Sequence, residues 1–236
     1  MDKIVENTEP IKNRKRFKDF LPIIVIVASV ALLIGEGFIY YRRVYLSPFW
    51  VNGQSMYPTL NGNAYDNYGN KLDESSGSSK VGYIVDYGVM DTHKSALNKI
   101  KRFDIVITKY SSLDEGNKIK RVIGLPGETI KFEIRGAGNE SNGDLYVNGK
   151  YYEQPISSEV IKNSTGYPVG EIKLAEDEYY VLGDNRNHSR DSRSEGPIKK
   201  EFIVGKAIAL CATCEVYYSG EGLDVKNIKH YFPRFF

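Results

Sequence analysis

The stretch "DLYVNGKYY", from Asp144 to Tyr152, indicates the fold class of this 236-residue chain. Asn148 and Gly149 stand between aliphatic and aromatic residues. An Asn-Gly pair with such flanks is typical of a two-residue hairpin turn, because both residues accept positive φ angles. We therefore predict two antiparallel strands that meet at this pair.

Segments of the same character lie on both sides of the hairpin. They are short, rich in Val, Ile, Tyr and Phe, and separated by turn-forming residues. They read "GYIVDYGV", "FDIVITKY", "IKRVIGL", "ETIKFEI", "EYYVLG" and "VGKAIALCATCEVYY". Helical periodicity is scarce after residue 50, which argues against βαβ units. We predict a mostly β fold, with an antiparallel β-rich domain over residues 42–236 and a polar loop insertion at 62–80.

The segment "FLPIIVIVASVALLIGEGFIYY", residues 20–41, differs from all of these. At about 1.5 Å per residue, a helix of this length crosses a hydrocarbon core of roughly 30 Å. We expect Glu36 near the outer headgroups, because a carboxylate at mid-bilayer is costly. We predict a single, uncleaved transmembrane signal anchor. A cleaved signal peptide is the alternative, although no clear small-x-small site follows.

The charges before this segment predict its orientation. Five Lys and Arg residues lie between positions 12 and 18. The positive-inside rule then places residues 1–19 in the cytoplasm and residues 42–236 outside the plasma membrane. Tyr40 and Trp50 have the aromatic character that is typical of the headgroup zone. Residues that closely follow Trp50 are therefore expected near the outer membrane surface.

The overall composition excludes some classes of function. The formal net charge is +2, so no nucleic-acid partner is expected. Cys211 and Cys214 are the only cysteines, and no four metal ligands have zinc spacing. Residues three apart on a strand point to opposite faces. We interpret the two cysteines as structural thiols, with a redox or regulatory pair as the alternative.

Ser55, in "VNGQSMYPTL" (residues 51–60), is a candidate nucleophile. A serine hydroxyl attacks only when a base takes its proton, and the usual base is histidine. His93, His188 and His230 are the three histidines, and none has a recognisable catalytic context. A Ser-His-Asp triad stays open, because its members can lie anywhere in a sequence.

A lysine is the other candidate base. It must be neutral near the working pH, although its reference pKa is about 10.4. Burial among apolar side chains lowers that pKa. Lys120, in "NKIKRVIGLPGE", has the most apolar surroundings and shares a strand face with Val122. On local context alone, an ordinary exposed strand lysine is the alternative.

Four ordered segments carry a resemblance to a known family. They read "GQSMYPTL" (53–60), "RFDIVI" (102–107), "KRVIGLPGE" (120–128) and "GDNRNHSRDSR" (183–193). Together with the preceding anchor, they resemble the boxes of the type I signal peptidases, in their bacterial, Gram-positive-like form. These are membrane-bound serine endopeptidases that remove signal peptides. The resemblance implies an antiparallel β-rich domain with a Ser-Lys dyad behind one transmembrane helix.

The resemblance also implies a role for each matching residue. Ser55 is the expected nucleophile and Lys120 the expected general base. Ser189 is expected to hydrogen-bond the Lys120 amine and orient it. Asp191 and Arg193 are expected to form a charge pair that supports their loop, since an unpaired buried charge is costly. The backbone N–H of Ser55 is expected to donate to the oxyanion.

The substrate expected from this resemblance is an extended segment with small-x-small residues, which a β-rich enzyme can bind as an added strand. Val51, Met56, Leu60 and Ile119 are expected to line the pocket for the residue before the cut and to keep the base dry. Some family members have a serine two positions before the nucleophile as a second oxyanion donor. Here that residue is Gly53, so the second donor is undefined.

The sequence thus predicts a plasma-membrane endopeptidase without metal or cofactor, because a Ser-Lys dyad needs neither. Its expected partners are preprotein signal peptides and the phospholipid membrane, and the oligomeric state is undefined. The alternative is a non-catalytic or substrate-dedicated factor of pilus or surface assembly on the same fold.

Overall fold

The computed structural model describes part of the chain and divides it into two compact units. The described residues are 17–51, 53–60, 82–110, 116–133, 143–156, 166–219 and 222–236. The units are Met1–Val44 and Tyr45–Phe236. The polar loop predicted at 62–80 lies outside the described residues.

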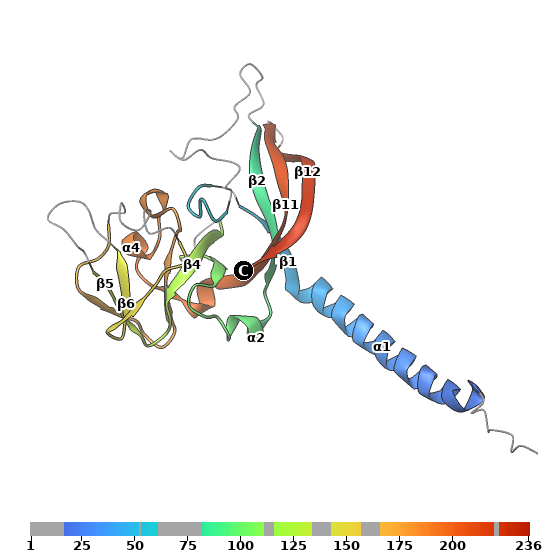
Figure 1. Ribbon diagram of the computed structural model, residues 1–236. Coiled ribbons are helices and arrows are strands. Elements are labelled where there is room, and N and C mark those ends of the chain that lie inside the picture. The colour runs from blue at the N-terminus through green and yellow to red at the C-terminus, as the bar shows by residue number, and fades with distance from the viewer. Residues whose placement is uncertain are drawn as a thin grey trace, which may run out of the picture. The chain divides into compact units, whose positions relative to one another are not determined.

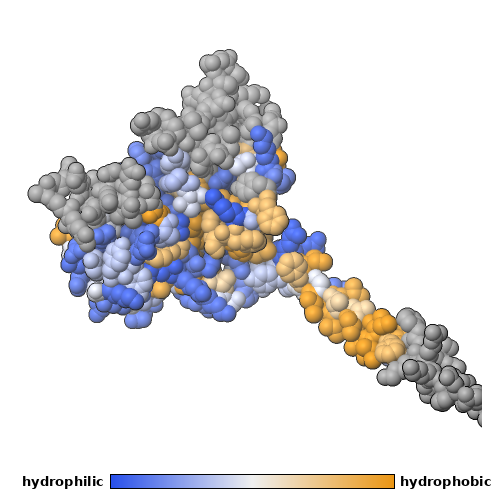
Figure 2. Space-filling model, viewed as in Figure 1, coloured by the Kyte–Doolittle hydropathy of each residue, from blue (hydrophilic) through white to orange (hydrophobic). Residues whose placement is uncertain are grey.

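The first unit is dominated by helix α1, which runs from Phe17 to Tyr45. Within the described residues, one stretch, Phe20–Tyr45, is long and apolar enough to cross a membrane. Its apolar side chains are exposed, and Figure 2 shows a hydrophobic surface along much of the helix. Exposed Leu, Ile and Val side chains at this density fit a lipid environment.

The second unit is built on antiparallel sheets, as predicted. The larger sheet has eight strands in the order β1-β2-β11-β3-β4-β9-β10, and β12 also pairs with β11. Its strands are β1 (Leu46–Trp50), β2 (Gly82–Asp91), β3 (Ile105–Thr108), β4 (Lys118–Gly124), β9 (Glu178–Leu182), β10 (Ile198–Lys199), β11 (Ile203–Ser219) and β12 (Gly222–Phe235). Figure 1 shows the long β2, β11 and β12 ladder.

The described part of this unit also contains a four-stranded sheet in the order β7-β6-β5-β8. Its strands are β5 (Thr129–Glu133), β6 (Asp144–Val147), β7 (Lys150–Tyr152) and β8 (Glu171–Lys173). The predicted hairpin is confirmed: Asn148 and Gly149 have φ angles of 49° and 77° and join β6 to β7. Short helices complete the unit, namely α2 (Lys94–Leu97), η1 (Arg186–His188), α4 (Ser192–Glu195) and η2 (Lys200–Phe202).

The burial of two strands, β3 and β4, determines where Lys120 lies. All four residues of β3 are buried, so β3 is a central core strand. In β4, exposure falls along the chain from an exposed Lys118 through a half-buried Ile119 to a buried Lys120. The lysine that the sequence singled out therefore enters the core at the point where β4 does.

Cys211 and Cys214 lie in β11, as expected, and both are free thiols. Cys214 is buried with Val85, and Tyr87 packs against them. Burial raises the pKa of the Cys214 thiol, which keeps it protonated and unreactive.

Candidate active site

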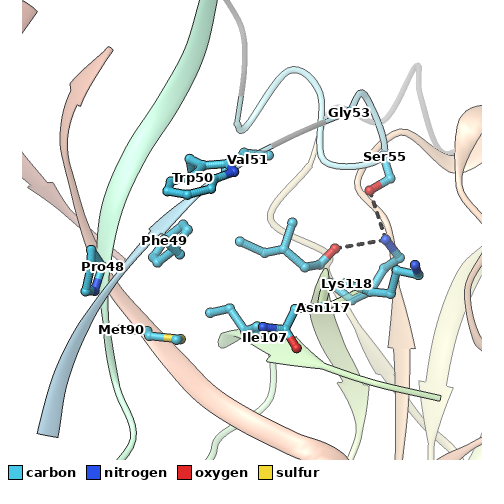
Figure 3. Close-up of a pocket in the computed structure, with 12 residues that line it drawn as sticks. Pro48, Phe49, Trp50, Val51, Gly53, Ser55, Met90, Ile107, Asn117 and Lys118 are labelled. Carbon is cyan, nitrogen blue, oxygen red and sulfur yellow. Dashed lines mark hydrogen bonds between the residues drawn. The ribbon is translucent and has the colours of Figure 1, made fainter. Parts of the chain in front are cut away.

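Ser55 follows β1, and residues 53–60 around it form turns that are closed by backbone hydrogen bonds. Tyr57 N–H donates to Gln54 O at 2.9 Å, and Leu60 N–H donates to Met56 O at 2.9 Å. These turns hold Ser55 at the edge of a cavity (Figure 3).

A distant segment fixes this loop from outside. Asn185 N–H donates to Ser55 O at 3.0 Å, and Asn185 Nδ2 donates to Gln54 O at 3.1 Å. Gly183 leaves room for the close approach, since a Cβ atom there would lie 2.4 Å from Ser55 O. The "GDN" residues therefore support the loop that carries Ser55.

Lys120 reaches the same point from β4. Its Nζ atom hydrogen-bonds Ser55 Oγ at 2.8 Å and Ile119 O at 2.9 Å, as the dashed lines in Figure 3 show. The two side chains come from positions 65 residues apart. A separation of 2.8 Å is within the range that direct proton transfer between a nucleophile and its base requires.

The surroundings of Lys120 favour its neutral amine, which is the form that can accept a proton. Its side chain is 3% exposed, and this burial lowers its pKa from 10.5 to about 8. Lys118 adds to the lowering, whereas the carboxylates of Asp191 and Asp184 oppose it. Burial is the largest of these effects. A usable fraction of Lys120 is therefore neutral at neutral to mildly alkaline pH.

A buried ion pair next to Lys120 joins the two halves of the site. Arg121 Nε and Nη2 donate to the Asp184 carboxylate at 2.8 and 2.6 Å. Thr59 Oγ1, from the nucleophile loop, donates to the same carboxylate at 2.5 Å. On its other side the loop is held by Arg234 of β12, which donates to Thr59 O at 2.6 Å.

The sequence did not single out Thr59, Arg121 or Arg234 as supporting residues. Arg121 and Asp184 stand inside the quoted "KRVIGLPGE" and "GDNRNHSRDSR" segments, so their positions in these segments were the available signal. Arg234 lies far from every such segment, and no sequence pattern would have found it.

Asp191 and Arg193 are paired, in the arrangement expected for a supporting loop. Arg193 Nε donates to Asp191 Oδ1 at 2.8 Å. Asp191 is fully buried and also accepts from the Gly183 N–H at 3.0 Å. This bond connects the ion pair to the segment that holds the nucleophile loop.

The expected bond from Ser189 to the Lys120 amine is corrected by the structure. Ser189 Oγ is buried without a hydrogen-bond partner among the described residues. It packs against Gly183, where a Cβ atom would lie 2.2 Å from it. Lys120 Nζ bonds instead to Ser55 and to the backbone of Ile119. Ser189 thus lies beside the loop contacts, not on the base.

A cavity of about 360 Å³ opens next to the dyad. Of the residues expected to line it, Val51 and Ile119 do so. Met56 and Leu60 are absent from its described lining. They are fully buried in the hydrophobic cluster that contains Val51, and Ile119 packs against this cluster. They therefore support the pocket wall from within the core.

Gly53 also lines the cavity. Its φ angle of 124° belongs to a region that side-chain-bearing residues rarely adopt. The backbone of the loop thus explains the glycine at this position, where a serine donor would be strained.

No histidine takes the place of Lys120 in the described part of the chain. His93 caps α2 and accepts from Ser95 N. His188 and His230 are exposed. Within the same described residues, no three His, Cys, Asp or Glu side chains gather as a metal site would require.

Comparison with known proteins provides evidence on the family that is independent of the site geometry. Residues 18–212 match the sequence pattern of a family described as signal peptidase, peptidase S26. Signal peptidase I T of Bacillus subtilis (strain 168) is 32% identical over 208 residues, which cover 84% of this chain and 88% of that protein. Signal peptidase I S of the same strain is 29% identical over 206 residues, which cover 84% and 90%.

Two further similarities are partial. Signal peptidase I V of Bacillus subtilis (strain 168) is 42% identical over 116 residues, which span 45% of this chain and 63% of that protein. A crystal structure of a signal peptidase I from Enterococcus faecalis V583 shares 30% identity. That comparison covers 46% of this chain and 96% of the other, with a TM-score of 0.34.

Proposed function

Because the chain belongs to the signal peptidase family, peptidase S26, we propose that it removes N-terminal signal peptides from exported preproteins. In this proposal Ser55 is the nucleophile and Lys120 the general base. The observation that supports it most is the 2.8 Å hydrogen bond between Lys120 Nζ and Ser55 Oγ. The two groups meet beside a cavity that can hold a substrate chain.

The chemistry follows from the protonation state of Lys120. The neutral amine takes the Ser55 proton as Oγ attacks the scissile carbonyl. The resulting ammonium gives that proton to the nitrogen of the leaving peptide, so the peptide bond breaks and an ester to Ser55 remains. Water then attacks the ester, again with Lys120 as base, and the signal-peptide carboxylate and the free serine result.

The backbone N–H of Ser55 is the proposed donor to the oxyanion. Gly53 has no side chain to add a second one. Asn185 and the Asp184–Arg121 pair hold the loop that carries Ser55, so they are proposed to position this donor together with the nucleophile. Asp191 and Arg193 are proposed to act indirectly. Their ion pair holds Gly183, which lies next to the residues that contact the Ser55 loop.

The substrate is proposed to bind along β4. Residues 118–120 of β4 pair with β3 on one side. On the other side, β4 pairs with β9 only from Arg121 onward. Among the described strands, residues 118–120 have no partner on that side. This length of β4 lies next to the cavity and suits an extended peptide, whose backbone can pair with β4 while small side chains enter the pocket. A small-x-small cleavage site is part of this proposal.

The membrane arrangement is part of the proposal. Helix α1 is proposed to be a single anchor, with the basic residues 1–19 in the cytoplasm, 20–41 in the plasma membrane and 42–236 outside it. The enzyme then meets signal peptides held in the same bilayer.

The test is cleavage of a preprotein by the full-length protein in detergent, with the product N-terminus read by mass spectrometry. Ser55→Ala and Lys120→Ala are each expected to lower turnover by at least a thousandfold. Lys173→Ala, an exposed lysine in β8, is the matched control and should retain wild-type turnover. Near-normal turnover by either dyad variant would refute the assignment. If the wild-type protein cleaves no preprotein, a non-catalytic assembly role is favoured.

A further inference from the structure

The turns that carry Ser55 are held at both ends by contacts from different parts of the fold. At the start, Val51 N–H donates to the backbone of β2 at 2.9 Å. At the end, the Thr59 hydroxyl donates to Asp184, and the Thr59 carbonyl oxygen accepts from Arg234 of β12 at 2.6 Å. The end of the loop is therefore fixed in part by a strand that lies 175 positions further along the chain.

The end of β12 is itself held in register. Arg234 pairs with Leu210 of β11, and Phe236 N–H donates to Ile208 O at 3.0 Å. β11 pairs in turn with β2, and β2 pairs with β1, in the ladder that Figure 1 shows. Arg234 therefore belongs to a paired strand of the same sheet as β1, the strand that Ser55 follows.

The restraint at Thr59 reaches Ser55 through two overlapping turns. One covers residues 54–57 and the other residues 56–60, and each is closed by a backbone hydrogen bond of 2.9 Å. Ser55 lies in the first turn and Thr59 in the second. A displacement of the Thr59 carbonyl would therefore shift Ser55 as well.

The two contacts of Thr59 differ in what else they hold. Asp184 is fully buried and also pairs with Arg121, so its loss would affect the core and the loop together. Arg234 is exposed, and its hydrogen bond to Thr59 is the only one it makes among the described residues. Removal of an exposed side chain changes stability little, whereas a shift of about 1 Å at a reacting group can lower a rate by about a hundredfold. Arg234 thus separates the position of the loop from the stability of the fold.

We propose that Arg234 is a positioning residue, which acts through Thr59 to keep Ser55 aligned with Lys120. This inference rests on the proposed function, since it takes Ser55 as the nucleophile. A charged donor makes a stronger hydrogen bond than a neutral one, which suits a restraint at an exposed position. The C-terminal strand then contributes to turnover without contacting the substrate or the base.

The test separates turnover from binding and stability. Full-length protein in neutral detergent is given one signal-peptide substrate, and kcat, KM and Tm are measured. Arg234→Leu keeps an apolar stem without a donor, and it should lower kcat by about tenfold. Its KM should stay within about twofold and its Tm within about 2 °C of the wild type. Arg234→Lys should recover at least about a third of the wild-type kcat, because a single bond needs only one donor.

Lys229→Leu is the matched control. Lys229 is an exposed cation of the same strand and pairs with Thr213 of β11. No hydrogen bond described for the chain joins it to residues 53–60, so its kcat should equal that of the wild type. An equal fall in Arg234→Leu and Lys229→Leu would overturn the inference, because β12 would then act through its charge and not through Thr59.

Other outcomes also overturn the inference. An unchanged kcat in Arg234→Leu would show that Ser55 does not depend on this contact. A fall that Arg234→Lys shares in full would show that a donor is not what the loop needs. A fall accompanied by a Tm loss of many degrees would assign Arg234 to the stability of the fold alone.

Hydrogen exchange measures the loop without turnover. In a Ser55→Ala background, a peptide that covers residues 53–60 should exchange about tenfold faster in Arg234→Leu than in Lys229→Leu. Equal exchange in the two variants would contradict the restraint. If the wild type cleaves no preprotein, the proposed function fails, and this exchange series still decides whether Arg234 holds the loop.

Discussion

The proposed nucleophile, Ser55, and its proposed base, Lys120, come from regions of opposite construction. Lys120 lies in β4, a regular strand whose pairing with β3 continues without a shift from Arg121 to Lys118. Ser55 lies in a loop of turns, and its position depends on contacts with Asn185 and Asp184. Those contacts bridge residues more than a hundred positions apart, since Thr59 and Asp184 differ by 125.

This difference teaches how each group is made reactive. The base needs only a buried place in a strand, because burial is the largest cause of its lowered pKa. The nucleophile needs an aligned Oγ and backbone N–H, which a loop provides only when other segments hold it. Substitutions around the Ser55 loop and substitutions at Lys120 should therefore affect stability and turnover in different ways.

The largest effect is expected on the nucleophile side, from Asp184→Asn. This change leaves the buried Arg121 guanidinium without a counter-charge and weakens the bond to Thr59. Loss of one partner of a buried pair costs about 3–5 kcal/mol in the free energy of unfolding. Thermal unfolding in detergent measures this, and turnover should fall with it.

Glu195→Gln is the matched control for that loss. It breaks an ion pair with Arg190, whose side chain is 79% exposed, and should cost under about 1 kcal/mol. An equal loss of stability in the two variants would show that the buried pair does not hold the loop.

An opposite effect on stability is expected on the base side, from Lys120→Met. The folded-state pKa of about 8 lies below the ordinary lysine value of 10.5, so folding disfavours the protonated amine. This penalty is fully present below pH 8, shrinks between pH 8 and 10.5, and is absent above. The variant should therefore be more stable at pH 7, by up to about 3 kcal/mol, and inactive.

The measurement is the melting temperature of wild type and Lys120→Met at pH 7 and at pH 10. The gain at pH 7 should be several degrees and should fall to roughly a quarter of that at pH 10. A gain of the same size at both pH values would mean that burial of the amine is not its source.

A smaller effect is expected from Gly53→Ser. The open space around Gly53 accepts a side chain, but its φ angle of 124° strains any L-residue by about 1–2 kcal/mol. Turnover should therefore fall by about tenfold with little change in KM. Gly149→Ser, at the β6–β7 turn, is the control for glycine loss at positive φ and should spare turnover. A rise in turnover for Gly53→Ser would instead show that the new hydroxyl acts as an oxyanion donor.

Much of the fold could be predicted because it depends on local pattern. The Asn148-Gly149 turn, the alternating strands and the apolar helix are each encoded by residues next to one another. The position of Lys120 was predictable for the same reason, since its apolar neighbours in β4 are adjacent in sequence.

The rest of the site depends on contacts between distant segments, which local pattern does not contain. Met56 and Leu60 follow Ser55 closely, yet the turns of the loop direct them into the core beneath the cavity. Ser189 follows the "GDN" segment, yet its hydroxyl packs against Gly183 instead of reaching the base. Arg234 can support the loop only because β12 pairs with β11. No sequence pattern near Arg234 predicts this pairing.

The pH dependence of kcat/KM tests the central claim most directly, since it reports the group that must be deprotonated in the free enzyme. For wild-type protein and a neutral signal-peptide substrate, kcat/KM should rise with pH through a midpoint of about 8 and level off above it. A midpoint near 6.5, as for a histidine base, or a flat profile would contradict Lys120 as the base.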